Sequence, residues 1–279
     1  MDFNSFIKTA LEEDVRDGDH STLCCIPADK KGKAILKIKE KGILAGIDLA
    51  QAIFLFMEPS AEMTIYKKDG EEVNIGDTAF EVIASIHTIL KAERLVLNIM
   101  QRMGGIATLT HIYANKIKNY PTQILDTRKT TPNFRWFEKQ AVVIGGGHNH
   151  RMGLYDMIML KDNHIDYCGG IEKAIEKANE YLKENKLNIP IEVETRSIDD
   201  VKKVVAFGNI QRIMLDNFTP EKIVEALKII DKQFETEASG GINLETIESF
   251  AKTGVDFISV GAIIHHAVSM DISLKAVIV

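Results

Sequence analysis

Apolar and polar positions follow two different rhythms in the first third of the chain. Residues 5–15 carry apolar side chains at helical spacing, which predicts a short amphipathic helix closed by an acidic stretch. Between residues 33 and 85 the spacing changes to alternation, with Leu36 and Ile38 apolar and their neighbours charged. This pattern predicts a small β-rich unit.

A long helical pattern follows over residues 88–119. Its apolar positions recur at helical spacing, are interrupted by Gly104 and Gly105, and stop before Pro121. We predict two helices that meet at the glycine pair.

After Pro121, short apolar runs alternate with amphipathic helical patterns. The strand candidates are 123–126, 156–160, 190–194, 212–215, 236–238 and 257–260, and the helix candidates are 171–186, 198–206, 220–231 and 244–253. Nearly every strand candidate ends in a polar residue or a glycine. In a parallel (β/α) barrel these strand ends converge on one face, so we favour an α/β barrel, incomplete because it has six strands, over a doubly wound sheet.

Composition bounds the class of protein. The chain has 279 residues, 45% of them apolar, and a formal net charge of -6, which argues against a basic footprint for nucleic acid. No uncharged apolar run is long enough to span a bilayer, and the amino terminus does not resemble a signal peptide. Three cysteines without paired spacing fit a reducing compartment, so we expect a cytoplasmic protein.

Positive charge is concentrated in one window of this acidic chain. Residues 126–164 contain six Lys or Arg and four carboxylates, so the window carries +2 and the other 240 residues carry -8. These cations stand beside the runs 124–125 and 157–160, which we take as buried strands. The window predicts a cleft for a small polyanion.

The cations of this window suit a carboxylate and a phosphate. Arg128 and Lys129 follow a strand beside Thr127, where the guanidinium can grip a planar carboxylate. Farther on, three glycines precede His150 and Arg151, a flexible loop with a hydrogen-bond donor and a second anion clamp. A zinc site in this loop is disfavoured by the spacing of its histidines and by the arginine.

Lys161 ends an apolar run and is expected to be partly desolvated. Three interpretations stay open: it binds an anion, it forms a Schiff base as in barrel aldolases, or it pairs with Asp162. Glu194 and Asp216 end successive strands and are candidates for holding Mg²⁺, binding ribose hydroxyls or stabilising positive charge. Glu192 lies deeper on the same side as Glu194 and is a candidate core partner for a lysine.

Two glycine-containing loops close the last two strands. Their exposed backbone N–H groups can cradle a phosphate, the usual task of the final loops of phosphate-binding barrels. The loop residues are Ser239, Gly240, Gly241, Val260, Gly261 and Ala262.

Taken in order, these segments closely resemble the quinolinate phosphoribosyltransferase family. The resemblance runs from about Thr9 to the carboxyl terminus through ALEEDVRDGDHST, AERLVLNIMQRMGGIATLT, DTRKTTPNFRWFEKQAV, GGGHNHRMGLYDMIMLKDNHI, IEVET, IMLDNF, EASGGI and DFISVGA. It implies transfer of phosphoribosyl from phosphoribosyl pyrophosphate to quinolinate with loss of CO2, in the presence of Mg²⁺. It also implies an amino-terminal α/β sandwich over residues 1–110, joined by 268–279, and an open α/β barrel over 111–267.

The resemblance also implies roles for single residues. Quinolinate would be held by Arg94, Thr127, Arg128, Lys129, His150, Arg151 and Lys161. Phosphoribosyl pyrophosphate would be held by Glu194, Asp216 and the two glycine loops, with Glu194 and Asp216 also facing Mg²⁺. Lys129, Lys161, Glu194 and Asp216 are the expected catalytic residues.

Arg94 is an ordinary surface charge by its helical position, but the resemblance implies that it reaches the site of a partner subunit in a homodimer. Asn133 and Phe134 stand where the family commonly has Gly-Leu, and Asn tolerates the same turn. His148 has no implied role, and we expect it to face solvent. Nicotinate as substrate, or a sensor that binds without catalysis, are the alternatives.

Overall fold

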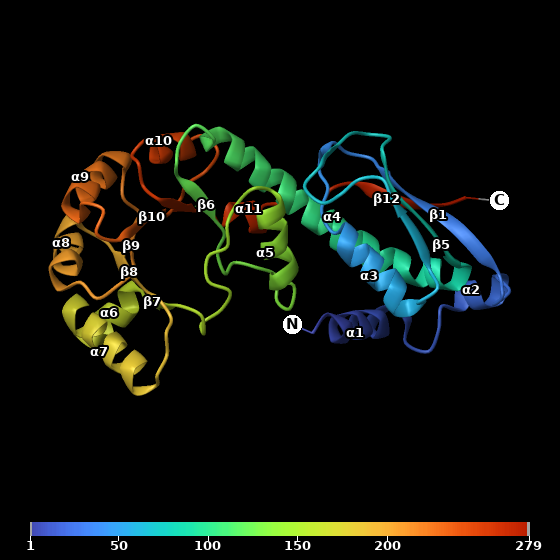
Figure 1. Cartoon of the computed structure of the whole chain (residues 1–279), viewed down its shortest axis with the longest axis horizontal. Coiled ribbons are helices and arrows are strands. Elements are labelled where there is room, and N and C mark those ends of the chain that lie inside the picture. The colour runs from blue at the N-terminus through green and yellow to red at the C-terminus, as the bar shows by residue number, and fades with distance from the viewer. Residues whose placement is uncertain (1, 278–279) are drawn as a thin grey trace. The chain divides into compact units, whose positions relative to one another are not determined.

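The computed structural model describes residues 2–277, and these form two compact units (Figure 1). The first unit takes in the chain up to His111, the segment Trp136–Gly146 and the chain from His266 onward. The second takes in Ile112–Arg135 and Gly147–His265.

The first unit is built on an antiparallel sheet with the order β12-β1-β5-β3. The bounds are β1 Lys31–Ile38, β3 Glu62–Ile65, β5 Thr78–Ser85 and β12 Ile272–Val277, and a separate small ladder joins β2 Gly42–Ile43 to β4 Glu72–Val73. On β1, Leu36 and Ile38 are buried while the intervening Lys37 is not, so the predicted alternation is confirmed. β12 pairs with β1 from Ile272 onward, which places the carboxyl-terminal segment in this sheet.

The helices that lie wholly or mainly in this unit are α1 Phe3–Val15, α2 His20–Cys25, α3 Ile47–Met57, α4 Ile86–Ile117 and α5 Arg135–Ile144. The last residues of α4, from Ile112, and Arg135 of α5 belong to the second unit. Helix α1 was predicted, but α3 lies inside the stretch that we assigned to strands, so that assignment was wrong for residues 47–57. Its apolar run fits strand or helix equally, and a distant side chain caps the helix. Asp69 accepts a hydrogen bond from the backbone N–H of Ile47, 2.9 Å away, at the first turn of α3.

Helix α5 was not predicted, and the segment Trp136–Gly146, which we assigned with 111–267 to the barrel domain, groups with the first unit. The reason is an aromatic cluster. The ring of Phe137, fully buried, lies 4.6 Å from that of Phe6 and 6.0 Å from that of Phe3, centroid to centroid. The carboxylate of Glu138, also buried, pairs with Arg102 at 2.8 Å.

Helix α4 is continuous through Gly104 and Gly105, so the prediction of two helices was wrong. The two glycines allow residues 268–270 to lie close to the helix. A Cβ on Gly105 would lie 1.9 Å from the carbonyl oxygen of Val268, and one on Gly104 would lie 3.0 Å from the Met270 sulfur. The pair therefore lets the segment before β12 pass against the helix.

Gly105→Ala is expected to destabilise the first unit by about 1–3 kcal/mol, because the new methyl group collides with backbone that cannot turn aside. Gly104→Ala is the matched control, since the atom it meets belongs to the flexible Met270 side chain. Thermal unfolding of both variants measures the difference. Equal midpoints would contradict the explanation.

The second unit contains a parallel sheet with the order β6-β11-β10-β9-β8-β7, the six strands that were predicted (Figure 1). Their bounds are β6 Gln123–Leu125, β7 Ile158–Leu160, β8 Ile191–Thr195, β9 Arg212–Asp216, β10 Glu235–Ser239 and β11 Phe257–Ser259. The outer strands β6 and β7 do not pair with each other among the described residues, so this is an open α/β barrel. Its helices are α6 Asp162–Cys168, α7 Ile171–Glu184, α8 Ile198–Phe207, α9 Pro220–Ile230, α10 Ile247–Ala251 and α11 Ala262–His265.

Strand burial departs from expectation at one edge. Ile124 and Leu125 of β6 are buried as predicted, but all three residues of β7 are only half-buried. β7 is an outer strand with one neighbour, β8, so one side of it lacks sheet cover. At the other edge, the backbone of His148 bridges to Leu125, and the His148 side chain is exposed as expected.

Candidate active site

Most predicted site residues of the second unit lie at the carboxyl ends of its parallel strands. Thr127, Arg128 and Lys129 follow β6, and Lys161 follows β7. His150 and Arg151 lie in the segment between α5 and β7, and the other predicted residues of this unit stand on or just after β8 to β11. Neighbouring strands run parallel in this sheet, so these ends face the same edge. The strand pairing therefore gathers the strand-end residues of this unit at one edge.

Arg128 and Arg151 are the central cations. Both are half-buried, and the Nε of Arg128 is buried without a hydrogen-bond partner among the described residues. Burial, and next the charge of Arg128, lowers the pKa of Arg151. Two guanidinium groups that repel each other, one with an unsatisfied donor, indicate a place for an anion.

The loop that carries Arg151 is braced from several sides. The guanidinium of Arg151 donates to the carbonyl oxygen of Met157 at 3.2 Å. Asp156 accepts from the backbone N–H of Met152 at 2.7 Å, and Arg135 donates to the Met152 carbonyl oxygen at 2.9 Å. These hydrogen bonds lie within the chain itself, so Arg151 is largely held in place before an anion binds.

His150 is buried, and its ring nitrogens both have partners. Nε2 lies 2.8 Å from Glu192 and 3.3 Å from Glu237, while the backbone N–H of Arg151 donates to Nδ1 at 2.7 Å. Burial lowers the pKa of His150, but the two carboxylates outweigh it and raise the pKa to about 9. The hydrogen bond from the Arg151 N–H requires an unprotonated Nδ1 and so opposes this rise in the pKa. While that bond is made, the ring carries its proton on Nε2, toward the two carboxylates.

This arrangement corrects one prediction and adds two residues. The buried partner of Glu192 is His150 rather than the lysine that was expected. Sequence reasoning missed Glu237 and Arg212, although Glu237 precedes Ser239 by two residues as Glu192 precedes Glu194. That spacing puts each glutamate on the same side of its strand as the functional residue, which was the available signal.

Glu194 and Asp216 lie at the carboxyl ends of neighbouring strands, as predicted, Glu194 one residue before the end of β8 and Asp216 at the end of β9, and both are half-buried. Burial, and next the charge of Asp216, raises the pKa of Glu194, whereas the charge of Lys161 lowers it. The two carboxylates and the ammonium therefore act on one another. Such a pair of carboxylates favours positive charge placed between them.

Lys161 departs from expectation because its side chain is exposed rather than partly desolvated. The described residues include no ion pair between Lys161 and Asp162. An exposed lysine lacks the apolar surroundings that make a Schiff-base lysine reactive. Of the three open interpretations, anion binding fits best.

The glycine loops come close to Lys129 and to a histidine that was not predicted. A Cβ on Gly261 would lie 3.2 Å from the Lys129 side chain and 3.1 Å from Nε2 of His265. Gly240 and Gly241 have positive φ angles of 104° and 63°, and a Cβ on Gly240 would lie 2.2 Å from the Asn217 side chain. The other loop residues, Ser239, Val260 and Ala262, lie beside these glycines.

Asn133 adopts the left-handed conformation that was expected where the family commonly has glycine, with a φ of 61°. The substitution therefore leaves the turn intact.

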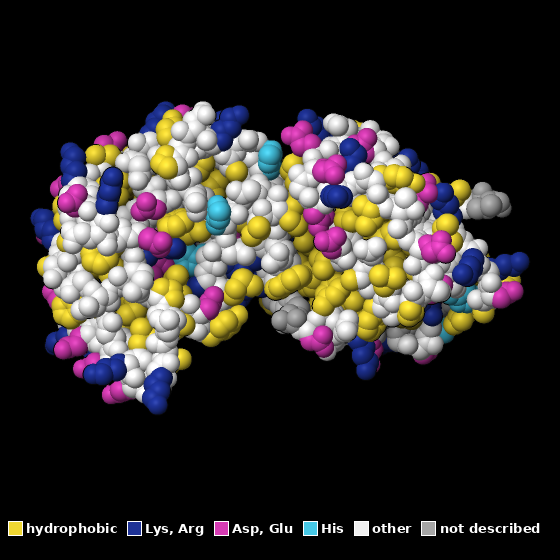
Figure 2. All heavy atoms as spheres, viewed as in Figure 1, with side chains coloured by type: hydrophobic (Ala, Val, Ile, Leu, Met, Phe, Trp, Pro, Cys, Tyr) yellow, Lys and Arg dark blue, Asp and Glu magenta, His cyan; other side chains and the backbone are white. Residues whose placement is uncertain are grey.

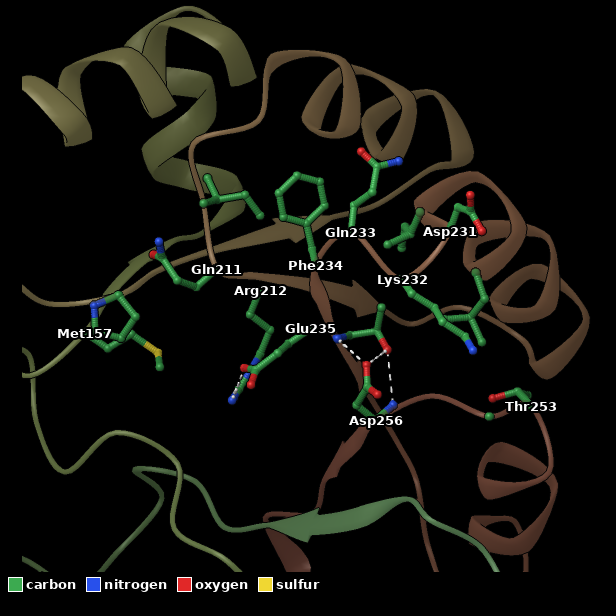
Figure 3. A pocket seen from close by; sticks show the side chains of 16 residues that line it. Met157, Gln211, Arg212, Asp231, Lys232, Gln233, Phe234, Glu235, Thr253 and Asp256 are labelled. Carbon is green, nitrogen blue, oxygen red and sulfur yellow. Dashed lines mark hydrogen bonds and ion pairs between the residues drawn. The ribbon is translucent and has the colours of Figure 1, made fainter.

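Arg94 lies on α4 in the first unit and is exposed. It lines a cavity of about 710 Å³ together with Asp19, Cys25 and Glu93. A second cavity, of about 1210 Å³, belongs to the second unit and opens at the amino ends of β8 to β10, opposite to the predicted site (Figure 3).

The surface agrees with the charge analysis. On the face shown in Figure 2, lysine and arginine side chains are interspersed with aspartate and glutamate, and no extended basic patch appears. Among the described residues, no helix has the length and apolar character needed to cross a membrane. The three cysteines are all free.

Comparison with known proteins agrees with this geometry. The models of the quinolinate phosphoribosyl transferase amino-terminal and carboxyl-terminal domains match residues 19–104 and 106–275. The chain belongs to the quinolinate phosphoribosyltransferase family. The resemblance noted in the sequence is therefore confirmed.

Relatives of this family align with nearly the whole chain. Quinolinate phosphoribosyltransferase [decarboxylating] 1b of Nicotiana tabacum is 45% identical, with 98% of this chain and 82% of the relative covered. The probable nicotinate-nucleotide pyrophosphorylase [carboxylating] of Bacillus subtilis is 39% identical, with 94% and 89% covered. The crystal structure of NadC from Streptococcus pyogenes matches with a TM-score of 0.92 at 37% identity, covering 99% of this chain and 97% of that one.

Proposed function

We propose that the protein transfers phosphoribosyl from phosphoribosyl pyrophosphate to quinolinate, giving nicotinate mononucleotide, pyrophosphate and CO2. The observation that carries this is the close pair of Arg128 and Arg151, in the unit whose strands β8 and β9 carry Glu194 and Asp216 at their carboxyl ends. Quinolinate brings two adjacent carboxylates, the counterpart of two facing guanidinium groups. The relatives named above carry the same reaction in their names.

In this proposal the protein acts by positioning and charge. Arg128, Arg151 and Lys161 hold the two carboxylates, which brings the pyridine nitrogen to the anomeric carbon of the ribose. That nitrogen forms the new C–N bond as the bond to pyrophosphate breaks, and the carboxylates of Glu194 and Asp216 stabilise the positive charge that develops on the sugar. The resulting pyridinium takes up the electron pair left by CO2, and a proton then replaces the carboxyl group.

The loops after β10 and β11 are suited to the 5'-phosphate of the donor. Gly240, Gly241 and Gly261 keep the backbone open to an oxyanion, and Lys129 passes over Gly261. We propose Lys129 as the cation of this phosphate region and as a neighbour of quinolinate.

Mg²⁺ belongs to the proposal as well. Glu194 and Asp216 fit it, because the charge of Asp216 raises the pKa of Glu194 and a divalent cation would relieve that repulsion. Bound with the donor, Mg²⁺ would neutralise the leaving pyrophosphate.

The direct test is turnover. Pure protein is incubated with Mg²⁺, phosphoribosyl pyrophosphate and either quinolinate or nicotinate, and nicotinate mononucleotide, pyrophosphate and CO2 are measured. We expect product and CO2 from quinolinate only. Turnover of nicotinate alone would refute the assignment, and donor binding without pyrophosphate release would favour a sensor. Borohydride trapping at Lys161 would favour Schiff-base chemistry.

We also propose a homodimer in which Arg94 completes the partner's site. Arg94 is exposed on α4 of the first unit, and the family resemblance assigns it across the interface. A cytoplasmic location completes the proposal, supported by the three free cysteines.

Mixing inactive Arg94→Ala protein with inactive Arg128→Ala protein is expected to restore activity. Each hybrid dimer would hold one site with both arginines intact, so up to about a quarter of wild-type activity returns if the chains mix at random. Turnover after subunit exchange, with size-exclusion chromatography to verify mixing, measures this. Inactive hybrid dimers would show that Arg94 does not act across the interface.

A further inference from the structure

A buried charged cluster lies in the barrel beneath Arg151. It consists of His150, Glu192 and Glu237, whose side chains are 5%, 0% and 0% exposed, and of the guanidinium of Arg212. Arg212 joins the cluster through Glu237, 3.3 Å away, and also pairs with Glu235 at 2.9 Å. Glu192, Glu237 and Arg212 come from three neighbouring strands, β8, β10 and β9.

This buried cluster lowers the stability of the fold, which a purely structural role does not explain. One oxygen of each carboxylate, Oε1 of Glu192 and Oε1 of Glu237, is buried without a hydrogen-bond partner in the described part of the chain. A buried carboxylate with an unsatisfied oxygen reduces stability relative to an apolar side chain of similar size. The two glutamates are therefore better explained by what they hold.

Glu192 and Glu237 fix the orientation of the His150 ring. Nε2 faces both carboxylates, and Nδ1 accepts from the backbone N–H of Arg151. The backbone N–H of His150 itself donates to the buried Asp126 at 2.9 Å. With these contacts, rotation of the ring would release the backbone of Arg151.

We propose that Glu237 and Glu192 are positioning residues that act through His150 to fix Arg151 opposite Arg128 and so set the spacing of the dicarboxylate clamp. This inference rests on the proposed function, because the clamp is the quinolinate site. It gives the buried glutamates a defined effect: they govern affinity for the pyridine dicarboxylate and leave the phosphoribosyl donor unaffected.

A metal ion is the alternative occupant of three such groups, since one ligand atom of each lies within 4.8 Å of the others. Two observations favour hydrogen bonding. Arg212 already supplies positive charge to Glu237, and the Nε2 of His150 is at hydrogen-bond distance from Glu192. Elemental analysis of the purified protein tests this, and one equivalent of tightly bound metal that disappears in Glu237→Gln would overturn the proposal.

The first test is Glu237→Gln, which keeps the shape and removes the charge. We expect the KM for quinolinate to rise roughly tenfold or more, with kcat and the KM for phosphoribosyl pyrophosphate changed less than about threefold. Glu235→Gln is the matched control: it lies on the same strand and also pairs with Arg212, but at the amino end beside the cavity of Figure 3 and away from His150. The control is expected to behave as wild type.

The second test is a double-mutant cycle with His150→Asn. If Glu237 acts through His150, adding Glu237→Gln to His150→Asn changes the KM for quinolinate less than about twofold further. Effects that multiply in full, or a Glu237→Gln protein with an unchanged KM, would overturn the proposal. Should Glu237→Gln fail to fold by circular dichroism, Glu192→Gln, whose side chain contacts the same Nε2, takes its place in both tests.

The wild-type control separates the two hypotheses. No turnover of quinolinate by wild-type protein refutes the proposed function. Turnover by the wild type, with variants that show no loss specific to quinolinate, refutes the positioning role alone.

Discussion

Arg128→Met is expected to lower kcat/KM for quinolinate about 100- to 1000-fold, the largest effect of any single substitution at the dicarboxylate clamp. Methionine keeps most of the length and apolar contact of the side chain but removes the guanidinium. The Nε of Arg128 is buried and has no hydrogen-bond partner among the described residues, so its N–H is available to donate a hydrogen bond to a substrate. In Arg128→Met, a carboxylate of the substrate would lose its charged partner at a site that is partly shielded from solvent.

Initial rates measured while each substrate is varied in turn locate this loss. We expect it in the KM for quinolinate and in kcat, with the KM for phosphoribosyl pyrophosphate nearly unchanged. Arg196→Met is the matched control, because Arg196 follows β8 but forms an exposed ion pair with Asp166 at 2.8 Å. A loss in Arg128→Met no greater than in this control would remove Arg128 from the clamp.

The barrel and its functional edge were predictable because they depend on local pattern. A strand buried between helices appears in the sequence as a short apolar run. The polar residue that follows the run lies at the carboxyl end of the strand, and this placement does not depend on distant contacts. Glu194 after Val193 and Asp216 after Leu215 are examples, and both lie where the pattern placed them. The family resemblance then supplied roles that the pattern left open.

The parts that were not predictable depend on contacts between distant segments. Gly105 stands at the place in a continuous helix where Val268 passes against it, and Asp69 accepts the N–H of Ile47 at the start of α3. Nothing within a short window of sequence reports either contact. The exposure of Lys161 is a similar case, since it depends on β7 being the uncovered edge of an open barrel.

Buried charge is the hardest feature to anticipate. Glu192 and Glu237 have the polarity of surface residues, and burial became reasonable only once His150 and Arg212 were placed beside them. One local pattern does point to this burial: a glutamate stands two positions before a functional residue on two strands. The pattern becomes visible once the strands are aligned in register. Pairing of strands β8, β9 and β10 thus turns separate sequence positions into one cluster.

Glu194→Gln and Asp216→Asn are each expected to lower kcat about 100-fold, with the KM for quinolinate changed less than about threefold. Both substitutions preserve size and remove the negative charge that would stabilise the positive sugar as pyrophosphate departs. The charge of Asp216 already raises the pKa of Glu194, so the two groups share one electrostatic task. Their double variant should therefore lose less than the product of the two single losses.

Single-turnover measurement of pyrophosphate release tests this without interference from later steps. Asp231→Asn serves as the control: it ends α9, and its φ of 45° is one that Asn adopts readily. If Glu194→Gln and Asp216→Asn raise the KM for quinolinate while kcat stays at the wild-type value, the carboxylates bind substrate and do not stabilise the transition state. Losses that multiply in full in the double variant would instead assign the two carboxylates to independent tasks.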